Sequence, residues 1–489
     1  MIAQLAQLEI PDVQWAGLVP LLIVGGASIV MLTLASIMGR FVPDWFWSVF
    51  TAGVGVAGFV ATVILWNEGD VYLTLAGAVA VDRFALFLIG ILCAMVVLGA
   101  LLAYDYLARE KLSELEFYVL LLLSASGGIV LAMANDLMVI FLGIEILSIA
   151  VYVMAAMHLG RAQSQEAGMK YFVLGAFASA FLLYGIALVY GATGSTNLTT
   201  AASVANNLTE NGLLMAGFAF LFVGLGFKIA AVPFHAWTPD VYQGAPSPTV
   251  AWMASGVKVA GFAAIMRIFW ASFDGQVDDW RPVMAGLAVA SMVLGSLLAL
   301  VQTDVKRMLA YSSISHAGFI LLGLQSYSAI GLEGSLFYLT AYAFVVAGSF
   351  AVVTLAGHDG DALHDLKDYA GLSDRRPVLA LVFTILLFAQ AGVPFTSGFF
   401  GKFYVIGATI DRGDYWLAVV AMVSAVVAAF LYLRIVLSMY GPSDGDAERS
   451  AVPFPIGAKV TLALSLGVTL FFGLFPGPLV DLARDALPL

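Results

Sequence analysis

Long apolar stretches alternate with short polar ones along almost the whole chain. Each stretch can cross a hydrocarbon layer of about 30 Å, which takes roughly 20 helical residues at 1.5 Å each. The pattern predicts an all-α integral membrane protein with about fourteen transmembrane helices, and an even number puts both termini on one side. The fourteen windows are 16–38, 45–66, 81–104, 117–134, 137–157, 171–191, 213–233, 247–270, 283–301, 308–325, 334–356, 377–409, 415–440 and 457–477.

Basic residues are distributed unevenly over the loops on the two sides. Because Lys and Arg prefer cytoplasmic loops, thirteen of them against five predict that both termini face the periplasm, in the inner (plasma) membrane of a bacterium. The inside set is Arg40, Arg109, Lys111, Arg161, Lys170, Lys306, Arg307, Lys367, Arg375, Arg376, Arg434, Arg449 and Lys459, and the outside set is Arg83, Arg267, Arg281, Arg412 and Arg484.

Two parts of the chain resemble each other weakly. AVPFHAW, from Ala231, is similar to GVPFTSG, from Gly392, and EAGMKYFVLGAF, from Glu166, aligns with EGSLFYLTAYAF, from Glu333. The alignment pairs spans 4–8 with spans 9–13, an odd offset of five spans, so the second five-helix repeat is predicted to be inverted relative to the first. The predicted domains are an N-terminal three-helix segment (1–115), two half-channel repeats (116–270 and 281–440) and a C-terminal helix (441–489).

Spans 7 and 12 are predicted to be broken helices. The window 377–409 has 33 residues, which is roughly 50 Å as one helix and too long for a straight crossing. Pro394 interrupts it, and Pro233 lies at the equivalent place of the first repeat. Backbone groups freed by such breaks are tolerated only where protein or a wet cavity covers them.

Four ionisable residues fall inside predicted spans: Glu145, Lys228, Lys258 and Lys402. A charge at mid-bilayer costs about 2.5 to 3.5 kcal/mol even on a lenient scale, so such residues are functional candidates. A buried lysine that gains and loses a carboxylate partner can bind and release a proton. We therefore predict a Glu145–Lys228 pair, with Lys258 and then Lys402 continuing toward the second half-channel. The alternatives are structural hydrogen bonds for Glu145 and Lys258 and snorkelling to the surface for Lys228 and Lys402.

Weaker polar candidates lie around these four residues. Helix packing or anchoring at a span end explains most of them as well as proton transfer does, and His235 and His316 are the most open to a role in the proton path. The set is Lys170, His235, Asp240, Tyr311, Ser312, Ser315, His316 and Thr396.

Composition narrows the chemistry of the chain. Hydrophobic residues make up 62% and charged residues only 11%, as expected in a membrane. A single cysteine, Cys93, excludes disulfides and thiolate-ligated iron–sulfur clusters. The net charge of −11 argues against nucleic acid as a partner, and the N-terminus has no basic segment typical of a cleaved signal peptide.

Two motifs suggest cofactors only superficially. GVGVAG, from Gly53 to Gly58, fits a dinucleotide pattern but lies inside an apolar span and follows no strand. The loop HDGDALHD, which contains His358, Asp361 and His364, is expected to be hydrated, and nothing in its spacing points to a metal. We therefore predict no cofactor and no metal in this chain.

The longest distinctive motif carries a family resemblance. GFKIAAVPFHAWTPDVYQGAPSPTVAWMASGVKVAGF, from Gly226 to Phe262, closely resembles the signature of the antiporter-like membrane subunits of proton-pumping NADH:quinone oxidoreductase, respiratory complex I. The resemblance covers essentially the whole chain. It is closest to the subunit N branch, because GVPFTSGFFGKFYV carries Lys402 where subunit M would carry a glutamate, and because the short tail after Gly477 leaves no room for the lateral helix of subunit L.

The resemblance implies roles for particular residues. Glu145 and Lys228 would form the pair of the first half-channel, Lys258 the central relay and Lys402 the group in the second half-channel, with Lys170, Lys306 and His316 auxiliary. It also implies that NADH, FMN, iron–sulfur clusters and quinone bind to other subunits, and that the partners are other membrane subunits, including other antiporter-like ones. An autonomous or Mrp-type Na⁺(K⁺)/H⁺ antiporter subunit and a purely structural spacer stay open as alternatives.

Overall fold

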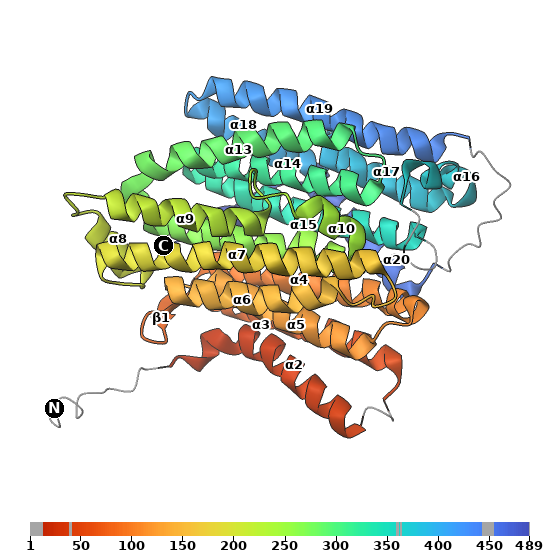
Figure 1. Ribbon diagram of the computed structural model, residues 1–489, viewed down its shortest axis with the longest axis horizontal. Coiled ribbons are helices and arrows are strands. Elements are labelled where there is room, and N and C mark those ends of the chain that lie inside the picture. The colour runs from red at the N-terminus through yellow and green to blue at the C-terminus, as the bar shows by residue number, and fades with distance from the viewer. Residues whose placement is uncertain (1–12, 39–41, 358–360, 362–363, 443–453, 489) are drawn as a thin grey trace.

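The protein is a bundle of long helices whose axes run roughly side by side (Figure 1). This computed structural model describes residues 13–38, 42–357, 361, 364–442 and 454–488. The helices of the first part are η1 (Trp15–Leu18), α2 (Val19–Met38), α3 (Asp44–Glu68), α4 (Arg83–Glu110), α5 (Glu114–Met133), α6 (Leu137–Ala155), α7 (Ala162–Thr193), α8 (Leu198–Ala205), α9 (Gly212–Ile229) and α10 (Thr238–Gly244).

One continuous helical segment and the helices of the second part follow. The segment Ser247–Ser272 consists of α11 (Ser247–Trp252), the π-helical turn η2 (Met253–Val257), α12 (Lys258–Ile265) and the π-helical turn η3 (Met266–Ser272). After it come η4 (Asp274–Gln276), α13 (Val277–Leu300), α14 (Val305–Gln325), α15 (Ala329–Ala356), η5 (Leu366–Tyr369), α16 (Leu372–Arg375), α17 (Pro377–Ala391), α18 (Ser397–Asp411), α19 (Tyr415–Tyr440), α20 (Ile456–Leu474) and α21 (Gly477–Asp485).

The helices confirm the predicted class of an all-α membrane protein. Among the described residues, twelve helices are long and apolar enough to cross a membrane by length and composition. The two predicted windows that are not among those twelve, 308–325 and 377–409, coincide with α14 and with the shorter helices α17 and α18. A helical segment therefore occupies every predicted window, although the number of membrane crossings stays a prediction.

A short β-hairpin, which the apolar pattern did not predict, closes one end of the bundle. β1 (Tyr72–Thr74) pairs antiparallel with β2 (Val79–Val81). The backbone N–H of Gln14 donates to Thr74 at 3.0 Å, and Arg83, just after β2, forms an ion pair with Asp485 at 3.6 Å. Both described chain ends therefore lie at this end, called the hairpin end, as an even number of crossings requires.

Both predicted breaks coincide with loops. α9 stops at Ile229, and Ala230 has a left-handed φ of 60° before a cis peptide bond to Pro233. α17 stops at Ala391, Gly392 has φ 90°, and α18 begins after Pro394 at Ser397. The window 377–409 thus contains two helical pieces separated by irregular backbone, whereas the window 213–233 contains one helix, α9, and the start of the loop that leads to α10.

The directions of α5 and α13, which the predicted repeat makes equivalent, are opposite. α5 ends beside the hairpin, where Ala134 bridges to Val79. α13 ends at Leu300, close to the bridge between Asp304 and Asp365 at the other end of the bundle. That arrangement is what an inverted repeat requires, and the repeat itself remains a prediction.

The segment Ser247–Ser272 runs through the core of the bundle, and its apolar window is buried along its entire length. A buried ion pair fixes its end near the hairpin: the two Nη atoms of Arg267 lie 2.6 and 2.9 Å from the carboxylate oxygens of Asp82. Asp82 also accepts the N–H of Ala85 and so caps α4. This anchoring, together with two π-helical turns, sets the position of Lys258 in the middle of the segment.

Candidate functional site

Lys228 lies in the last turn of α9, just before the first helix break. Its side chain is only 4% exposed, so it does not snorkel to a surface of this chain. Its Nζ donates to the Ser148 hydroxyl at 2.6 Å and lies 6.0 and 5.7 Å from the ring centres of Tyr152 and Tyr171. The ammonium is therefore held in a mostly aromatic site with one hydroxyl partner.

Glu145 is one helical turn from Ser148 on α6 and accepts a short hydrogen bond from Ser179 of α7. Among the described residues, no ion pair within 4.0 Å joins Glu145 to Lys228, so the predicted contact is not direct in this conformation. Ser148 accepts from Lys228 and donates to the carbonyl of Ile144, the residue before Glu145. The Lys228 ammonium is therefore bound one helical turn from Glu145 along α6.

Lys258 follows the π-helical turn η2 and is 2% exposed. Its Nζ donates to the carbonyl of Ser313 at 2.6 Å and also contacts the Ser313 hydroxyl, and it lies 5.5 Å from the ring centre of Tyr342. Lys258 belongs to the first predicted repeat, whereas Ser313 on α14 and Tyr342 on α15 belong to the second. This lysine therefore joins the two halves of the bundle.

A glycine allows the helices of Lys228 and Lys258 to approach each other closely. A Cβ on Gly261, one turn after Lys258, would lie 3.0 Å from Ile229 and 3.3 Å from the side chain of Lys228. Any larger residue would therefore push α9 away. The two lysines are on neighbouring, tightly packed backbone segments.

Lys402 lies on α18, just after the second break. Its Nζ donates to the carbonyls of Gln390 and Ala391, each at 2.8 Å. These are the last residues of α17, where helix carbonyls lack intrahelical partners and the helix dipole favours a cation. Gly392, with its positive φ, leaves room for the lysine, because a Cβ there would lie 2.9 Å from Lys402 Cδ. The break thus creates the binding site of the ammonium.

A chain of polar side chains lies between Lys258 and Lys402. His316 contacts the hydroxyls of Tyr338 at 2.7 Å and Tyr432 at 3.0 Å. Tyr432 contacts Ser312 at 2.6 Å, and Ser312 donates to the Gln390 side chain at 3.1 Å. Since Ser312 is adjacent to Ser313 in sequence, α14 connects the partner of Lys258 to the residue whose carbonyl binds Lys402.

A small cavity adjoins this chain. It is lined by His316, Tyr338, Tyr342, Gln390 and glycines of α18, and it has room for about one water molecule. A water molecule in this cavity, beside His316, Tyr338, Tyr342 and Gln390, can extend the hydrogen-bonded path.

Lys170 belongs to a different environment, at the end of the bundle opposite the hairpin. It contacts Glu166 and Asp240, each at 2.7 Å, and Arg307 contacts the other oxygen of Asp240 at 2.7 Å. Burial alone would raise the pKa of Asp240, but the two cations outweigh this effect and hold the pKa below its usual value. These residues form a partly exposed ion-pair network and lie apart from the buried lysines.

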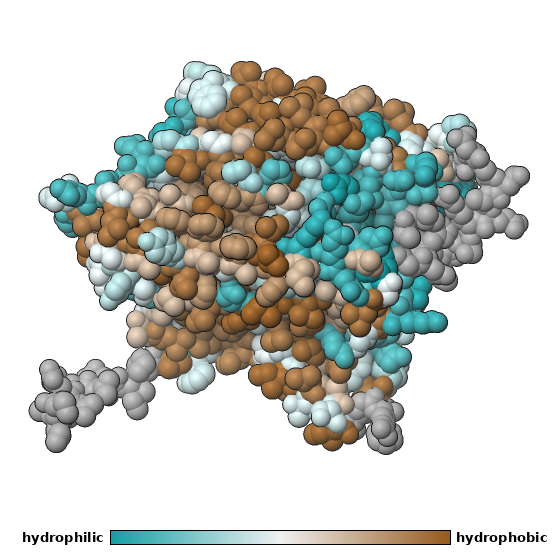
Figure 2. Space-filling model, in the orientation of Figure 1, coloured by the Kyte–Doolittle hydropathy of each residue, from teal (hydrophilic) through white to brown (hydrophobic). Residues whose placement is uncertain are grey.

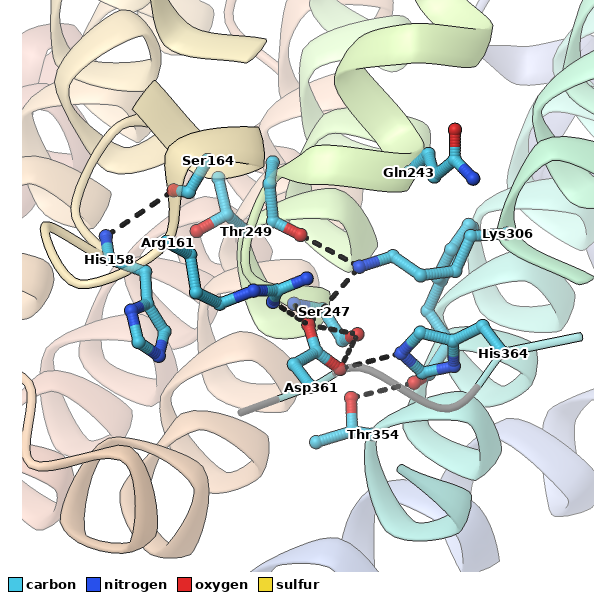
Figure 3. A network of polar contacts seen from close by, with 12 residues as sticks. His158, Arg161, Ser164, Gln243, Ser247, Thr249, Lys306, Thr354, Asp361 and His364 are labelled. Carbon is cyan, nitrogen blue, oxygen red and sulfur yellow. Dashed lines mark hydrogen bonds and ion pairs between the residues drawn. The ribbon is translucent and has the colours of Figure 1, made fainter. Parts of the chain in front are cut away.

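Lys306 is fully buried in the first turn of α14, with Nζ 2.8 Å from the carbonyl of Ala245 and 3.1 Å from Asp361. The expectation of a hydrated loop at HDGDALHD is wrong for Asp361 and His364, which are 0% and 4% exposed. The carboxylate of Asp361 is drawn inward because five other groups donate to it or pair with it, and Figure 3 shows Arg161, Ser247, Lys306 and His364 around it. His358 lies outside the described residues.

The remaining predicted candidates have local roles. His235 lies half-buried in the loop after Pro233, and its Nδ1 has no hydrogen-bond partner in the described part of the chain. Ser315 bonds to Ser296 at 3.0 Å, Thr396 donates to the carbonyl of Val393 at 2.6 Å, and Tyr311 packs partly buried against the core. None of these contacts reaches the four central residues.

Comparison with known proteins places the chain in a family. Residues 134–428 match the sequence family described as "NADH:quinone oxidoreductase/Mrp antiporter, TM". The chain is 41% identical to NADH-quinone oxidoreductase subunit N of Trichlorobacter lovleyi, over 89% of each protein, and 40% identical to subunit N of Salinispora arenicola, over 99% of each. It also superimposes with a TM-score of 0.81 and 32% identity on a chain of respiratory complex I from Thermus thermophilus, covering 95% of this chain and 99% of that one.

The sequence family, the full-length relatives and the structural superposition all agree with the resemblance that the segment Gly226–Phe262 carries. The chain therefore belongs to the family of antiporter-like membrane subunits of NADH:quinone oxidoreductase and Mrp antiporters, on the subunit N branch.

Proposed function

We propose that this chain translocates protons as an antiporter-like membrane subunit of respiratory complex I. One observation carries the proposal: four ionisable residues lie within the apolar bundle, and the three lysines among them are buried at a helix break or a π-helical turn. Burying such charges is costly, so their presence indicates a function. A purely structural helix bundle would need none of these charges, whereas proton transfer needs groups that bind and release protons.

The proposed route runs from Glu145 and Lys228 to Lys258, along α14, to Lys402. Lys228 releases its proton when it loses its polar partners and binds one when a carboxylate approaches. Ser312, His316 and Tyr432 supply exchangeable hydrogen-bonding groups between Lys258 and Lys402. Redox energy released in other subunits would shift the bundle between states that differ in the Glu145–Lys228 contact.

The surface around Glu145 supports membrane partners. Leu142, Ile146, Ile149 and Val153 are all at least 42% exposed on the face of α6 next to Glu145. A carboxylate at this depth is unfavourable against lipid, so we propose that another membrane subunit covers this face. NADH, FMN, iron–sulfur clusters and quinone would then be bound elsewhere in the complex.

The end of the bundle opposite the hairpin would face the cytoplasm. Arg109, Arg161, Lys306, Arg307 and Arg376 all lie at this end or in its loops, in agreement with the preference of basic residues for cytoplasmic loops. The hairpin end, with both described chain ends, would then face the periplasm of a bacterial inner membrane.

Purification in mild detergent tests membership of the complex. We expect the tagged chain to co-migrate with a large assembly that oxidises NADH, and to show no quinone reductase activity when expressed alone. A stable lone chain with Na⁺-dependent proton flux would favour the antiporter instead.

Ser148→Ala tests the hydrogen bond that holds Lys228 near Glu145. The substitution removes the hydroxyl that holds the ammonium, and a hydrogen bond worth roughly 1 kcal/mol corresponds to about a fivefold decrease in rate. We expect NADH-driven proton pumping by the reconstituted complex to fall by this factor. Ser203→Ala, at an exposed position of α8, should leave pumping unchanged, and equal rates for both variants would show that Ser148 has no such role.

A further inference from the structure

The end of the bundle opposite the hairpin contains a buried charge cluster outside the proposed route. Asp361 is its centre, and its carboxylate accepts from the backbone and hydroxyl of Ser247 at 3.2 and 2.9 Å. His364 Nε2 lies 2.8 Å and Lys306 Nζ 3.1 Å from it (Figure 3), and Tyr106 donates to it at 3.2 Å. These partners come from α4, α11, α14 and the loop of Asp361 itself, so the cluster joins both halves of the bundle.

Asp361 and Lys306 form a fully enclosed ion pair, since neither side chain is exposed. Arg161 adds a second cation, with Nη1 3.5 Å from Asp361. Burial favours the neutral form of Asp361, but Lys306, His364 and Arg161 hold its pKa well below its usual range. The carboxylate therefore stays ionised and pairs with Lys306.

A polar pocket of 310 Å³ reaches this cluster from the surface. Gln163, Lys170, Asp240 and Gln243 line its walls, and Asp361 and His364 belong to its lining as well. Figure 2 shows hydrophilic surface over α10 and the start of α7, where the pocket lies. Polar walls and this volume admit several water molecules, so water lies next to His364, which is 4% exposed and contacts Asp361.

Lys306 also lies on the helix that leads to the central lysine. Ser313, which binds Lys258, is seven residues further along α14, roughly 10 Å at 1.5 Å per residue. A proton would cross that distance through a short chain of hydrogen-bonded waters or side chains. Lys306 also donates to the carbonyl of Ala245, directly after α10, so movement of the segment behind the first helix break would disturb the same ammonium.

We propose that Lys306 and Asp361 form a second lysine–carboxylate switch, which takes protons from the polar pocket and passes them toward Lys258. This inference rests on the proposed function. One proton moves and no electron does: pocket water or His364 gives a proton to the Lys306 amine, and the Lys306 ammonium later gives a proton to the chain leading to Lys258. Asp361 remains a carboxylate throughout and acts as a positioning residue for Lys306.

Two variants of the intact complex separate this role from a structural one. Lys306→Arg keeps the charge and a partner for Asp361, but a guanidinium does not release its proton. Lys306→Met combined with Asp361→Asn replaces the buried pair by neutral groups, which proteins often tolerate without loss of stability. The switch predicts that at least one variant assembles in normal amounts, and that every assembled variant loses most of its NADH-driven proton pumping. Asp374→Asn, an exposed carboxylate on the same connection, is the matched control and should pump normally.

The outcomes distinguish the inference from the proposed function. Normal pumping by an assembled Lys306→Arg or double-variant complex, when Lys258→Met is inactive, overturns the switch and leaves the proposed function in place. Failure of both variants to assemble, when Asp361→Glu assembles and pumps normally, also contradicts the switch, because the pair would then be needed only for folding. Normal pumping by Lys258→Met overturns both.

Discussion

Replacing Lys258 by methionine is expected to stop proton transfer between the two halves of the chain. The residue is 2% exposed, its ammonium contacts Ser313, and α14 leads from there to the surroundings of Lys402. Methionine has a similar shape, fills the same space and holds no proton. We expect NADH oxidation and proton pumping by the reconstituted complex to fall together by at least about tenfold, equivalent to roughly 1.4 kcal/mol in the barrier.

The matched control is Lys459→Met, which removes an exposed lysine from the first turn of α20. Assembly of both variants is checked by the amount of complex recovered after mild-detergent purification. A Lys258→Met complex that assembles and pumps like the Lys459→Met complex would contradict the assigned role.

Glu145→Gln and Lys228→Ala are expected to leave the complex assembled while reducing both proton pumping and quinone reduction. Glutamine keeps the hydrogen bond from Ser179 but loses the charge that attracts the lysine. Alanine removes the ammonium that contacts Ser148. We expect a several-fold loss for either variant, measured in proteoliposomes with NADH and a quinone.

The effects of these two substitutions should be strongly non-additive, because both act on one exchange of partners. The double variant is expected to be little worse than Lys228→Ala alone. Glu116→Gln, an exposed carboxylate near the start of α5, serves as the control. Normal pumping by both single variants would leave only the structural spacer for this half of the chain.

The sequence predicted the features that depend on single residues in an apolar setting. Lys228, Lys258 and Lys402 stand out because a charge inside an apolar window is rare and costly, and all three are buried in the structure. The break near Pro394 followed from the length of its window and from the backbone chemistry of proline. The family resemblance then agreed with the curated relatives and the fold.

Features that depend on long-range packing were not predictable in the same way. Ser148 is one of many serines in apolar helices, and only the approach of α9 shows that it binds Lys228. Asp361 belongs to a loop whose composition indicates solvent, yet partners more than 100 residues away in sequence, such as Ser247, draw it into the interior. The sequence did not mark Gln390 and Tyr432 as part of the site either, because an isolated polar residue in an apolar helix more often serves packing.

Proton translocation by the complex carrying Lys258→Arg tests the central claim most directly. Arginine keeps the positive charge but does not release a proton under these conditions, so the variant removes titration while it preserves the charge of the site. Acidification or alkalinisation of the proteoliposome lumen is measured during NADH oxidation by complexes recovered in equal amounts. We predict that translocation falls to the level of Lys258→Met, and translocation at the level of the unsubstituted complex would contradict the account.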